Sequence, residues 1–542
     1  MTKLNAPDYS LYLVTSRELL PPGVDFYDSL RASLKGGVTL VQIREKHADN
    51  GELLEIAEKS LKICDEFNVP MLINDNLAVA LALPERVGLH IGQEDFPVAK
   101  ARALLGPKRL LGISVHTVEQ AAAARTSGAN YAGVGAVYGT LSKANVTEDK
   151  VLGPRRTAHV IEALQGFPSV LIGGINQRTA ARALFGAAGP EHAPAGIAVI
   201  SAIVARQDAQ EAARELKSMV NAFLSARSSA QKPIASAFGL GASRSQLKVE
   251  SLVSRSGEFL RALREGSPPL IQTLTSHVSS TLSANVTLAL SASPIMSHQD
   301  AEADDLGNVT GAVVLNIGTI GEEARRGMRA VGSAANRGGK PVVLDPVGVG
   351  ASAFRRQAVN EIMDHTQITL LKGNAAELGA IAGLTEVQSR GVDSGSGTLR
   401  DARGLVLSLA RRERCLVLLT GKTDYLSDGE VVITCSNGHA LLGAITGSGC
   451  ALGVAVATGL AAACLASQGS EVKGAGSSIV KAQPDDLLAG ALFGILSMTI
   501  ASELAAARPE VRGPGTFIAA LLDELSLMTP ETFAQRAKVA LE

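Results

Sequence analysis

The chain has 542 residues, with 51 basic and 52 acidic side chains and a net charge of -1. This length exceeds what one ordinary hydrophobic core supports, so we expect two or more domains. Balanced charge, the absence of tryptophan and an aromatic content of only 3% argue against nucleic acid and against an anionic membrane as partners.

The five cysteines are an odd number with no CxxC pair, which favours a reduced setting over a disulfide framework. Residues 1–8 contain no apolar stretch of the kind found in signal peptides. Residues 450–466 are apolar and nearly long enough to span a bilayer, but their Gly and Ala content favours a buried helix. We therefore expect a cytoplasmic protein with no membrane partner.

Short apolar runs alternate with amphipathic segments through the first half of the chain. The runs occupy residues 11–14, 40–43, 71–73, 89–91, 110–114, 131–134, 169–172 and 196–200. Eight such βα units predict a (β/α)8 TIM barrel, with a doubly wound open sheet as the alternative. In a barrel, functional side chains gather at the carboxyl ends of the strands.

Polar side chains stand at these expected strand ends. The alternation of a strand places Gln42, Arg44 and Lys46 on one face at the end of the second strand. Asp75 and Asp95 follow the next two strands, and carboxylates beside basic groups can hold Mg²⁺ together with a diphosphate. The alternative is a solvated basic strand end, with an aspartate such as Asp95 serving as a helix N-cap.

A second anion site is expected across the barrel mouth. The loop at 138–143 offers two hydroxyls and an ammonium group after the sixth strand. Gly174 and Ser201 follow the seventh and eighth strands, where backbone N–H groups commonly form a phosphate cup in this fold. The mouth would therefore hold one diphosphate and one monophosphate.

The first half resembles the thiamine phosphate synthases through VQIREK, IND, HIGQED, GISVHT, YGTLSK, IGGIN and GIAVISAI, in order over residues 8–222. This resemblance implies coupling of a pyrimidine diphosphate to thiazole phosphate with release of pyrophosphate. Two departures are Gly139, where Pro is usual, and Ser142, where Thr is usual. The implied roles are the pyrimidine for Gln42 and Asn74, the diphosphate for Arg44, Lys46, Ser114 and Lys143, Mg²⁺ for Asp75 and Asp95, and the thiazole phosphate for Thr140, Ser142, Gly174 and Ser201.

A stretch rich in Ser, Ala, Gly and Lys at 225–245 reads as a linker, and a helix is expected over 246–265. We therefore expect a barrel domain at 1–230, a linker with a connecting helix at 231–265, and a second domain at 266–542. A surface insertion is expected at 471–486, where Gly, Ser and Lys interrupt a helical region.

The second domain begins a new βα alternation. Strands are expected at 312–318, 342–344, 368–371, 416–419 and 431–435, and a helix at 281–291. The order predicts an α/β domain with an open parallel sheet and a site at its carboxyl edge. A glycine loop at 443–450 then precedes the apolar helix, where N–H groups and the helix dipole suit a phosphate. At this helix start we expect the Cys450 thiol to have a pKa below its ordinary value of about 8.5. The alternative is a glycine-rich turn before a core helix.

The second half resembles the hydroxyethylthiazole kinases, a branch of the ribokinase-like fold, through PLIQ, ASPIM, LNIGT, LDPVG, KGNAAE, GVD, LTGKTD and TGSGC. The resemblance implies ATP as co-substrate, Mg²⁺, and trimers whose sites lie between subunits. Two departures are Ser276, where Asn is common, and Lys372, where Arg is common. The implied roles are the base for Cys450, the anion hole for Gly447, Ser448 and Gly449, Mg²⁺ for Asp345 and Glu377, the ATP phosphates for Lys372 and Thr420, and the thiazole for Met296.

The two resemblances reinforce each other, because one half would make the thiazole phosphate that the other consumes. Together they imply a bifunctional enzyme of thiamine biosynthesis, similar to the fungal and yeast arrangement, and a homo-oligomer built on kinase-domain trimers. Three alternatives stay open: an active synthase with a weakened kinase marked by Ser276, a non-catalytic sensor of thiamine phosphate, and a different small-alcohol kinase fused to a different barrel enzyme.

Overall fold

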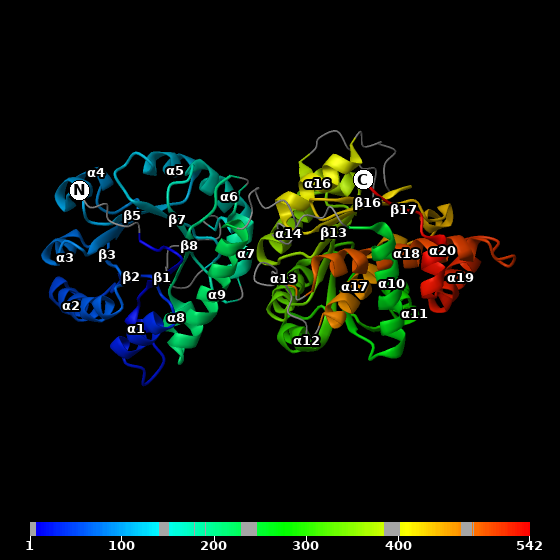
Figure 1. Cartoon of the computed structure of the whole chain (residues 1–542), viewed down its shortest axis with the longest axis horizontal. Helices are drawn as coiled ribbons and strands as arrows, with labels where there is room; N and C mark the ends of the chain where they lie inside the picture. Colours follow the sequence, from blue (N-terminus) through cyan, green and yellow to red (C-terminus); the bar gives the residue numbers. More distant parts are fainter. Residues whose placement is uncertain are drawn as a thin grey trace. The chain divides into compact units, whose positions relative to one another are not determined.

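The computed structural model describes residues 7–139, 151–177, 179–189, 191–228, 247–383, 401–467, 480 and 482–542. The chain divides into two compact units, Met1–Ser229 and Ala230–Glu542. Both are α/β, as the sequence predicts (Figure 1).

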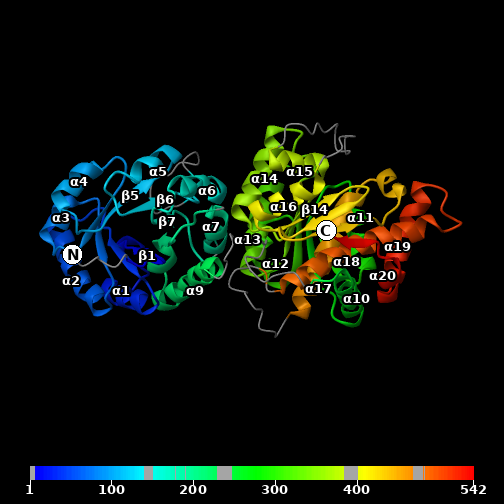
Figure 2. The same cartoon turned by 45° about the horizontal axis from the view of Figure 1, so that its top comes forward.

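The first unit is a closed barrel of eight parallel strands, so the TIM-barrel prediction is confirmed and the open-sheet alternative is wrong. β1 and β8 close the ring, with Tyr12 opposite Ala198, and helices surround the strands (Figures 1 and 2). The strands are β1 (Leu11–Val14), β2 (Leu40–Ile43), β3 (Met71–Asn74), β4 (Gly88–Ile91), β5 (Leu111–Val115), β6 (Tyr131–Val134), β7 (Ser169–Ile172) and β8 (Gly196–Val199). The helices are α1 (Phe26–Lys35), α2 (Asn50–Glu66), α3 (Leu77–Ala82), α4 (Val98–Leu105), α5 (Val118–Ala124), α6 (Gly153–Ala163), α7 (Ala180–Ala187), α8 (Ser201–Val204) and α9 (Ala209–Ser228), with a 3₁₀ turn η1 (Arg17–Leu19).

Alternation along each strand separates two apolar cores in the barrel. Val41 and Ile43 of β2 belong to the larger core, which includes the surrounding helices. Leu40 belongs to a smaller cluster with Tyr12 and Tyr131. Side chains of successive strand residues point to opposite faces, so the smaller cluster fills the barrel interior below the strand ends.

The second unit is built on one nine-stranded sheet in the order β10-β9-β11-β12-β13-β14-β15-β16-β17. Strands from β10 to β14 pair in parallel, and β15, β16 and β17 add to the edge as antiparallel strands. The five predicted strands are present, whereas four short ones, β9, β10, β15 and β17, were not predicted as strands. The bounds are β9 (Leu270–Leu274), β10 (Ser293–Ile295), β11 (Thr310–Asn316), β12 (Val342–Asp345), β13 (Leu370–Asn374), β14 (Leu416–Thr420), β15 (Asp424–Ser427), β16 (Val432–Cys435) and β17 (Val539–Leu541).

Helices cover both faces of this sheet. Ala312 and Val314 of β11 join one core, and Val313 and Leu315 join the other, which is why the strand reads as a continuous apolar run. The first core includes residues of α10 (Val249–Glu265), α11 (Ser280–Ala289), α17 (Ser448–Ala466), α18 (Pro484–Ala506), α19 (Pro514–Leu527) and α20 (Pro530–Arg536). The second includes residues of α12 (Ala303–Val309), α13 (Glu322–Arg337), α14 (Ala353–His365), α15 (Ala375–Ala382) and α16 (Ala402–Glu413), and the 3₁₀ turns are η3 (Asp300–Glu302) and η4 (Ala440–Ala444).

The helix expected to connect the two domains, α10, packs against α17, α18 and α20 and is part of the second unit. The predicted C-terminal boundary of the insertion at 471–486 is wrong, because residues 484–486 form the first turn of α18. Asp486 accepts a hydrogen bond from Arg255 of α10 at 2.8 Å, which fixes that turn. Residues 471–479 and 481 lie outside the described part of the chain.

Helices α17 and α18 are apolar enough to cross a membrane by composition, yet the apolar windows are 72% and 89% buried within the protein. Their close approach depends on glycine. A Cβ at Gly459 would lie 2.0 Å from the carbonyl oxygen of Gly490, and a Cβ at Gly490 would lie 2.6 Å from that of Gly459. These are core helices of an α/β unit, in agreement with the prediction for residues 450–466.

We predict that Gly459→Ala destabilises the second unit by about 1–3 kcal/mol, because the added methyl group must push α17 and α18 apart. Scanning calorimetry of the full chain should show a thermal midpoint several degrees lower. Gly515→Ala in α19 is the matched control, since nothing lies within 4 Å of a Cβ there. An unchanged midpoint for Gly459→Ala would contradict the tight helix contact.

Candidate active sites

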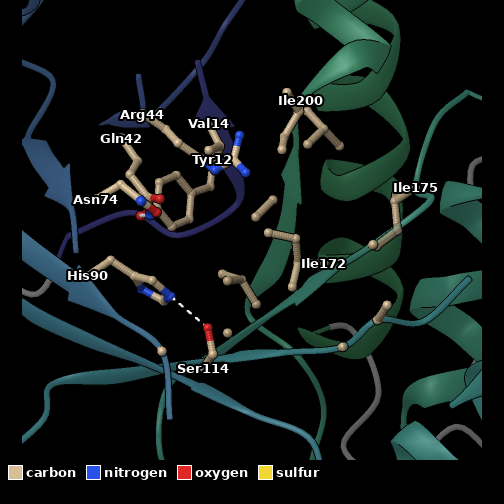
Figure 3. A pocket seen from close by; sticks show the side chains of 18 of the residues that line it. Tyr12, Val14, Gln42, Arg44, Asn74, His90, Ser114, Ile172, Ile175 and Ile200 are labelled. Atoms are coloured by element: carbon tan, nitrogen blue, oxygen red, sulfur yellow. Dashed lines mark hydrogen bonds between the residues drawn. The ribbon is translucent and has the colours of Figure 1, made fainter. Parts of the chain in front are cut away.

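A cavity of about 370 Å³ opens at the carboxyl ends of the barrel strands. Figure 3 shows Gln42, Arg44 and Asn74 on one side of it, across from Ile172 and Ile175. The cavity therefore has a polar wall and an apolar wall, as expected for a site that receives a polar, charged ligand with a flat apolar part.

The polar wall includes the three residues predicted on one face of β2. Gln42, Arg44 and Lys46 all line the cavity. The backbone N–H of Arg44 donates to Thr15 Oγ1 at 3.0 Å, which ties this strand end to the loop after β1. Burial lowers the pKa of Arg44, while the nearby Asp75 opposes that shift, and the guanidinium stays charged.

Two carboxylates lie at neighbouring strand ends on the same wall. Asp75 follows β3 in a left-handed backbone conformation (φ 57°), and Asn74 Nδ2 donates to its Oδ2 at 2.6 Å. Asp95 Oδ2 accepts from the Gly92 N–H at 2.7 Å, and both aspartates line the cavity. Among the described residues no group of three or more His, Cys, Asp or Glu is suited to a metal. Two hard carboxylates fit a Mg²⁺ ion that takes further oxygens from water and a diphosphate.

A neutral cup faces these charges. Gly173 (φ 99°) and Gly174 (φ 63°) adopt conformations that glycine favours, and a Cβ at Gly174 would lie 2.6 Å from the Gly139 carbonyl oxygen. Both glycines line the cavity with Ser201, the first residue of α8. Backbone N–H groups without helical partners suit an anion here. Thr140, Ser142 and Lys143 lie outside the described residues.

A chain of hydrogen bonds that the sequence did not predict runs through the barrel interior; we call it the interior chain. Gln42 Nε2 donates to the Tyr12 hydroxyl at 2.5 Å, and the Tyr12 and Tyr131 hydroxyls are 2.8 Å apart. His90 Nδ1 lies 2.8 Å from the Tyr131 hydroxyl, and its Nε2 lies 3.1 Å from Ser114 Oγ (Figure 3). The alternation of side chains along β1, β4 and β6 could have indicated that these polar residues face the barrel interior. It cannot show which of their polar atoms form hydrogen bonds.

The second unit gathers a compact polar cluster at adjacent strand ends. Asn316 and Asp345 are register partners on β11 and β12, and Asn316 Nδ2 donates to Asp345 Oδ2 at 2.9 Å. The same amide nitrogen lies 3.1 Å from Cys450 Sγ, and Lys372 Nζ lies 3.0 Å from Asp345 Oδ1. The structure thus brings together Asp345, Lys372 and Cys450, which were predicted as site residues, with Asn316, which was predicted only as part of the LNIGT motif.

Burial controls the charges in this cluster. It raises the pKa of Asp345, and it would lower that of Lys372, but the nearby acidic groups, above all Asp345, shift Lys372 upward overall. For the Cys450 thiol, burial and then the charge of Asp345 raise the pKa. The prediction of a lowered thiol pKa is therefore wrong. The helix start was visible in the sequence, but the burial and the neighbouring carboxylate arise only in the folded unit.

Glu377 has a local structural role at the start of α15. It forms a capping box with Asn374, and its Oε2 accepts the Asn374 N–H at 2.9 Å. Its Oε1 accepts the Gly348 N–H at 3.0 Å, from the loop after β12. Because the oxygens of Glu377 and Asp345 already accept protein donors, they fit a Mg²⁺ ion held through water. Thr420 ends β14, in register with Asn374.

The glycine loop lies against Lys372. Gly447 is the N-cap of α17 with φ 84°, and a Cβ there would lie 2.9 Å from Ser279 Cβ. The Cβ position of Gly449 lies 3.8 Å from Lys372 Nζ. Ser448 begins the helix, so the first N–H groups of α17 and the ammonium group face the same place, as an anion hole requires.

Met296 follows a different strand from the residues of this cluster. It comes after the edge strand β10, and β9 separates β10 from β11, a spacing of about 10 Å. Met296 therefore follows a strand two positions away from that of Asn316 in the sheet.

Arg355 of α14 fixes the loops that carry the cluster. Its guanidinium donates to the carbonyl oxygens of Ile317 (2.8 Å), Gly318 (2.8 Å) and Val347 (2.7 Å). The first two follow β11 and the third follows β12. Arg355 therefore holds the strand ends of Asn316 and Asp345 at a fixed distance.

Comparison with known proteins gives matches to both halves. A model of the thiamine monophosphate synthase family matches residues 11–203, and a model of the hydroxyethylthiazole kinase family matches residues 260–531. A relative from Schizosaccharomyces pombe, described as a probable thiamine biosynthetic bifunctional enzyme, is 35% identical over 97% of this chain and 96% of its own length. The thiamine biosynthetic bifunctional enzyme of Saccharomyces cerevisiae is 32% identical over 83% of this chain and 86% of its own. A hydroxyethylthiazole kinase of Haemophilus influenzae is 38% identical over 52% of this chain and 97% of its own.

We predict that iodoacetamide alkylates Cys450 more slowly at pH 8 than it alkylates a free thiol, because its raised pKa keeps it protonated. Asp345→Asn should accelerate the reaction, since it removes the negative charge and frees the Lys372 ammonium group. Peptide mass spectrometry measures the rate, with the fully buried Cys64 as the unreactive control. A rate for Cys450 above that of a free thiol would contradict the raised pKa.

We predict that Arg355→Lys lowers kcat/KM of the second unit by about tenfold, because a lysine cannot bridge three carbonyl oxygens. Arg356→Lys is the matched control, since the Arg356 side chain is exposed and contacts the Gly350 carbonyl oxygen. Steady-state assays of thiazole phosphorylation measure both. Equal effects of the two substitutions would argue against the clamp.

Proposed function

Because the chain belongs to the family of bifunctional thiamine biosynthetic enzymes, we propose that its units perform successive reactions through the residues described above. The second unit phosphorylates 4-methyl-5-(2-hydroxyethyl)thiazole with ATP. The barrel then couples the thiazole phosphate with 4-amino-2-methyl-5-pyrimidinylmethyl diphosphate to give thiamine phosphate and pyrophosphate.

The observation that carries the synthase assignment is one cavity lined both by cationic side chains, Arg44 and Lys46, and by the glycine turn at Gly173 and Gly174. Gln42 and Asn74 orient the pyrimidine, while Arg44 and Lys46 hold its diphosphate and stabilise the charge on departing pyrophosphate. The aminopyrimidine stabilises the methylene cation, and the thiazole nitrogen attacks it. No protein nucleophile is required.

The remaining groups of the cavity hold the two anions. Asp75 and Asp95 would hold Mg²⁺, which when bound neutralises charge on the diphosphate. The backbone at Gly174 and Ser201 holds the thiazole phosphate. We assign Ser114 and Lys143 to the diphosphate and Thr140 and Ser142 to the thiazole phosphate by resemblance.

In the kinase, we propose that positioning and charge supply the catalysis rather than a strong base. Lys372, Thr420 and the N–H groups of Gly447, Ser448 and Gly449 hold the phosphates of ATP. The Cys450 thiol, kept protonated by its raised pKa, contacts the substrate hydroxyl and orients it. Asp345 and Glu377 would hold Mg²⁺ through water, which when bound offsets phosphate charge.

We also propose a cytoplasmic homo-oligomer built on kinase-domain trimers, with Met296 reaching the thiazole of a neighbouring subunit. Two features support this: Met296 follows the edge strand, two strands from that of Asn316, and Val278, next to the glycine loop's contact Ser279, is 67% exposed. Exposed apolar side chains of this kind are common at subunit interfaces.

The test supplies the purified full chain with the thiazole alcohol, ATP, Mg²⁺ and the pyrimidine diphosphate, and follows both products by chromatography. We predict that the native chain makes thiamine phosphate. Lys46→Ala should accumulate thiazole phosphate, because only pyrophosphate departure is impaired. Cys450→Ala should slow phosphorylation about tenfold and recover full coupling when thiazole phosphate is supplied.

Matched controls are Lys62→Ala, on the exposed face of α2, and Cys464→Ala, near the far end of α17; both should behave as the native chain. If the native chain converts only supplied thiazole phosphate, the kinase assignment fails and Ser276 becomes the residue to restore to Asn. If it converts neither substrate, the enzyme assignment fails in favour of a sensor.

A further inference from the structure

The interior chain joins two parts of the cavity to which different ligands are assigned. It starts at Gln42 on β2, beside the proposed pyrimidine site, and ends at Ser114 on β5, beside the proposed diphosphate site. Tyr12 and Tyr131 in the middle are 1% and 0% exposed, so water does not interrupt it there. Tyr131 does not line the cavity and has no direct path to a ligand.

The atoms at the Gln42 end fix the direction of the first bond. The Gln42 amide nitrogen has protons and no lone pair to offer, so the Tyr12 oxygen accepts from it. The Tyr12 proton can then point to the Tyr131 hydroxyl, at 2.8 Å. In that direction Tyr131 donates its proton to Nδ1 of His90, also at 2.8 Å. His90 then accepts at Nδ1 and carries its own proton on Nε2.

The tautomer of His90 then sets the orientation of the Ser114 hydroxyl at the other end of the interior chain. With its proton on Nε2, His90 donates to Ser114 Oγ at 3.1 Å. The Ser114 proton is then free to point into the cavity. If the hydrogen bonds ran in the opposite direction, Ser114 would donate its proton to His90 and only its lone pairs would face the ligand. A diphosphate offers acceptors only, so the first direction matches it.

We propose that Tyr131 and His90 set the direction of the Ser114 hydroxyl, so that Ser114 donates a hydrogen bond to the diphosphate as pyrophosphate departs. The proposal rests on the synthase reaction proposed above. Tyr131 is a positioning residue that acts through His90. Because negative charge grows on the leaving group in the transition state, a donor aimed at it raises kcat more than it strengthens ground-state binding.

The kinetic test compares Tyr131→Phe with Tyr9→Phe in the full chain, using supplied thiazole phosphate. The Tyr9 ring packs 5.1 Å from that of Tyr131, but its hydroxyl takes no part in the interior chain, so it is the matched control. Tyr131→Phe should lower kcat for coupling by about tenfold and leave the KM for thiazole phosphate unchanged. Tyr9→Phe should match the native chain. No loss in Tyr131→Phe would overturn the proposal.

A double-mutant cycle separates positioning from a general effect on the fold. If Tyr131 acts only through Ser114, then Tyr131→Phe costs nothing further in the Ser114→Ala background. An equal loss in both backgrounds would show a structural role and overturn the proposal. A silent Ser114→Ala would also overturn it.

A measurement on the native chain tests the direction without turnover and needs a variant only to assign the signals. Nitrogen-15 NMR of histidine-labelled protein reports which ring nitrogen carries the proton, with the His90 signals identified by their loss in His90→Asn. A proton on Nε2 supports the proposed direction, and a proton on Nδ1 overturns it. A native chain that does not couple the two substrates would instead overturn the proposed function, so the two failures are distinguishable.

Discussion

Parallel strand pairing is the constraint on which both sites depend. It brings the carboxyl ends of neighbouring strands to one edge, so residues far apart in sequence, such as Asn316 and Asp345, become register partners. In the barrel the same pairing, closed into a ring, sets Arg44, Asp75 and Asp95 around one cavity. A ligand can then be gripped by several loops, while the strands beneath keep those loops at fixed spacing.

The two units handle buried polarity in different ways. The second unit buries an ion pair, Asp345 with Lys372, and either partner alone would be an uncompensated charge costing about 3–5 kcal/mol. Asn316 and the loop clamp of Arg355 supply the geometry that makes such a pair tolerable. The barrel interior instead joins neutral groups, where each hydroxyl both accepts and donates. The interior chain, being neutral, avoids the desolvation penalty of a buried charge. It can set the orientation of its last hydroxyl only while every one of its residues is present.

The sequence predicted what depends on local pattern. All eight barrel strands were found, because each is a buried apolar run bounded by polar loops. The strands β9, β10, β15 and β17 were missed, because the first three contain polar residues or a proline and β17 has only three residues. The lowered pKa of Cys450 was wrong because Asp345 and the burial come from other elements. Tyr12, His90 and Tyr131 had no predicted role, because the interior chain exists only after five strands have been brought together.

The distribution of charge in the barrel fits the coupling reaction that we propose for it. The diphosphate gains negative charge at its leaving oxygen, and the cations Arg44 and Lys46 lie on that side of the cavity. The thiazole phosphate keeps its charge throughout, and it is assigned to the neutral cup around Gly174. Strong attraction to a group whose charge does not change would tighten substrate and transition state equally and would hold back product. In the proposed reaction, cations placed where charge develops direct their effect to the reaction step. In the second unit Lys372 likewise lies beside Gly449, in the loop to which we assign the phosphates of ATP.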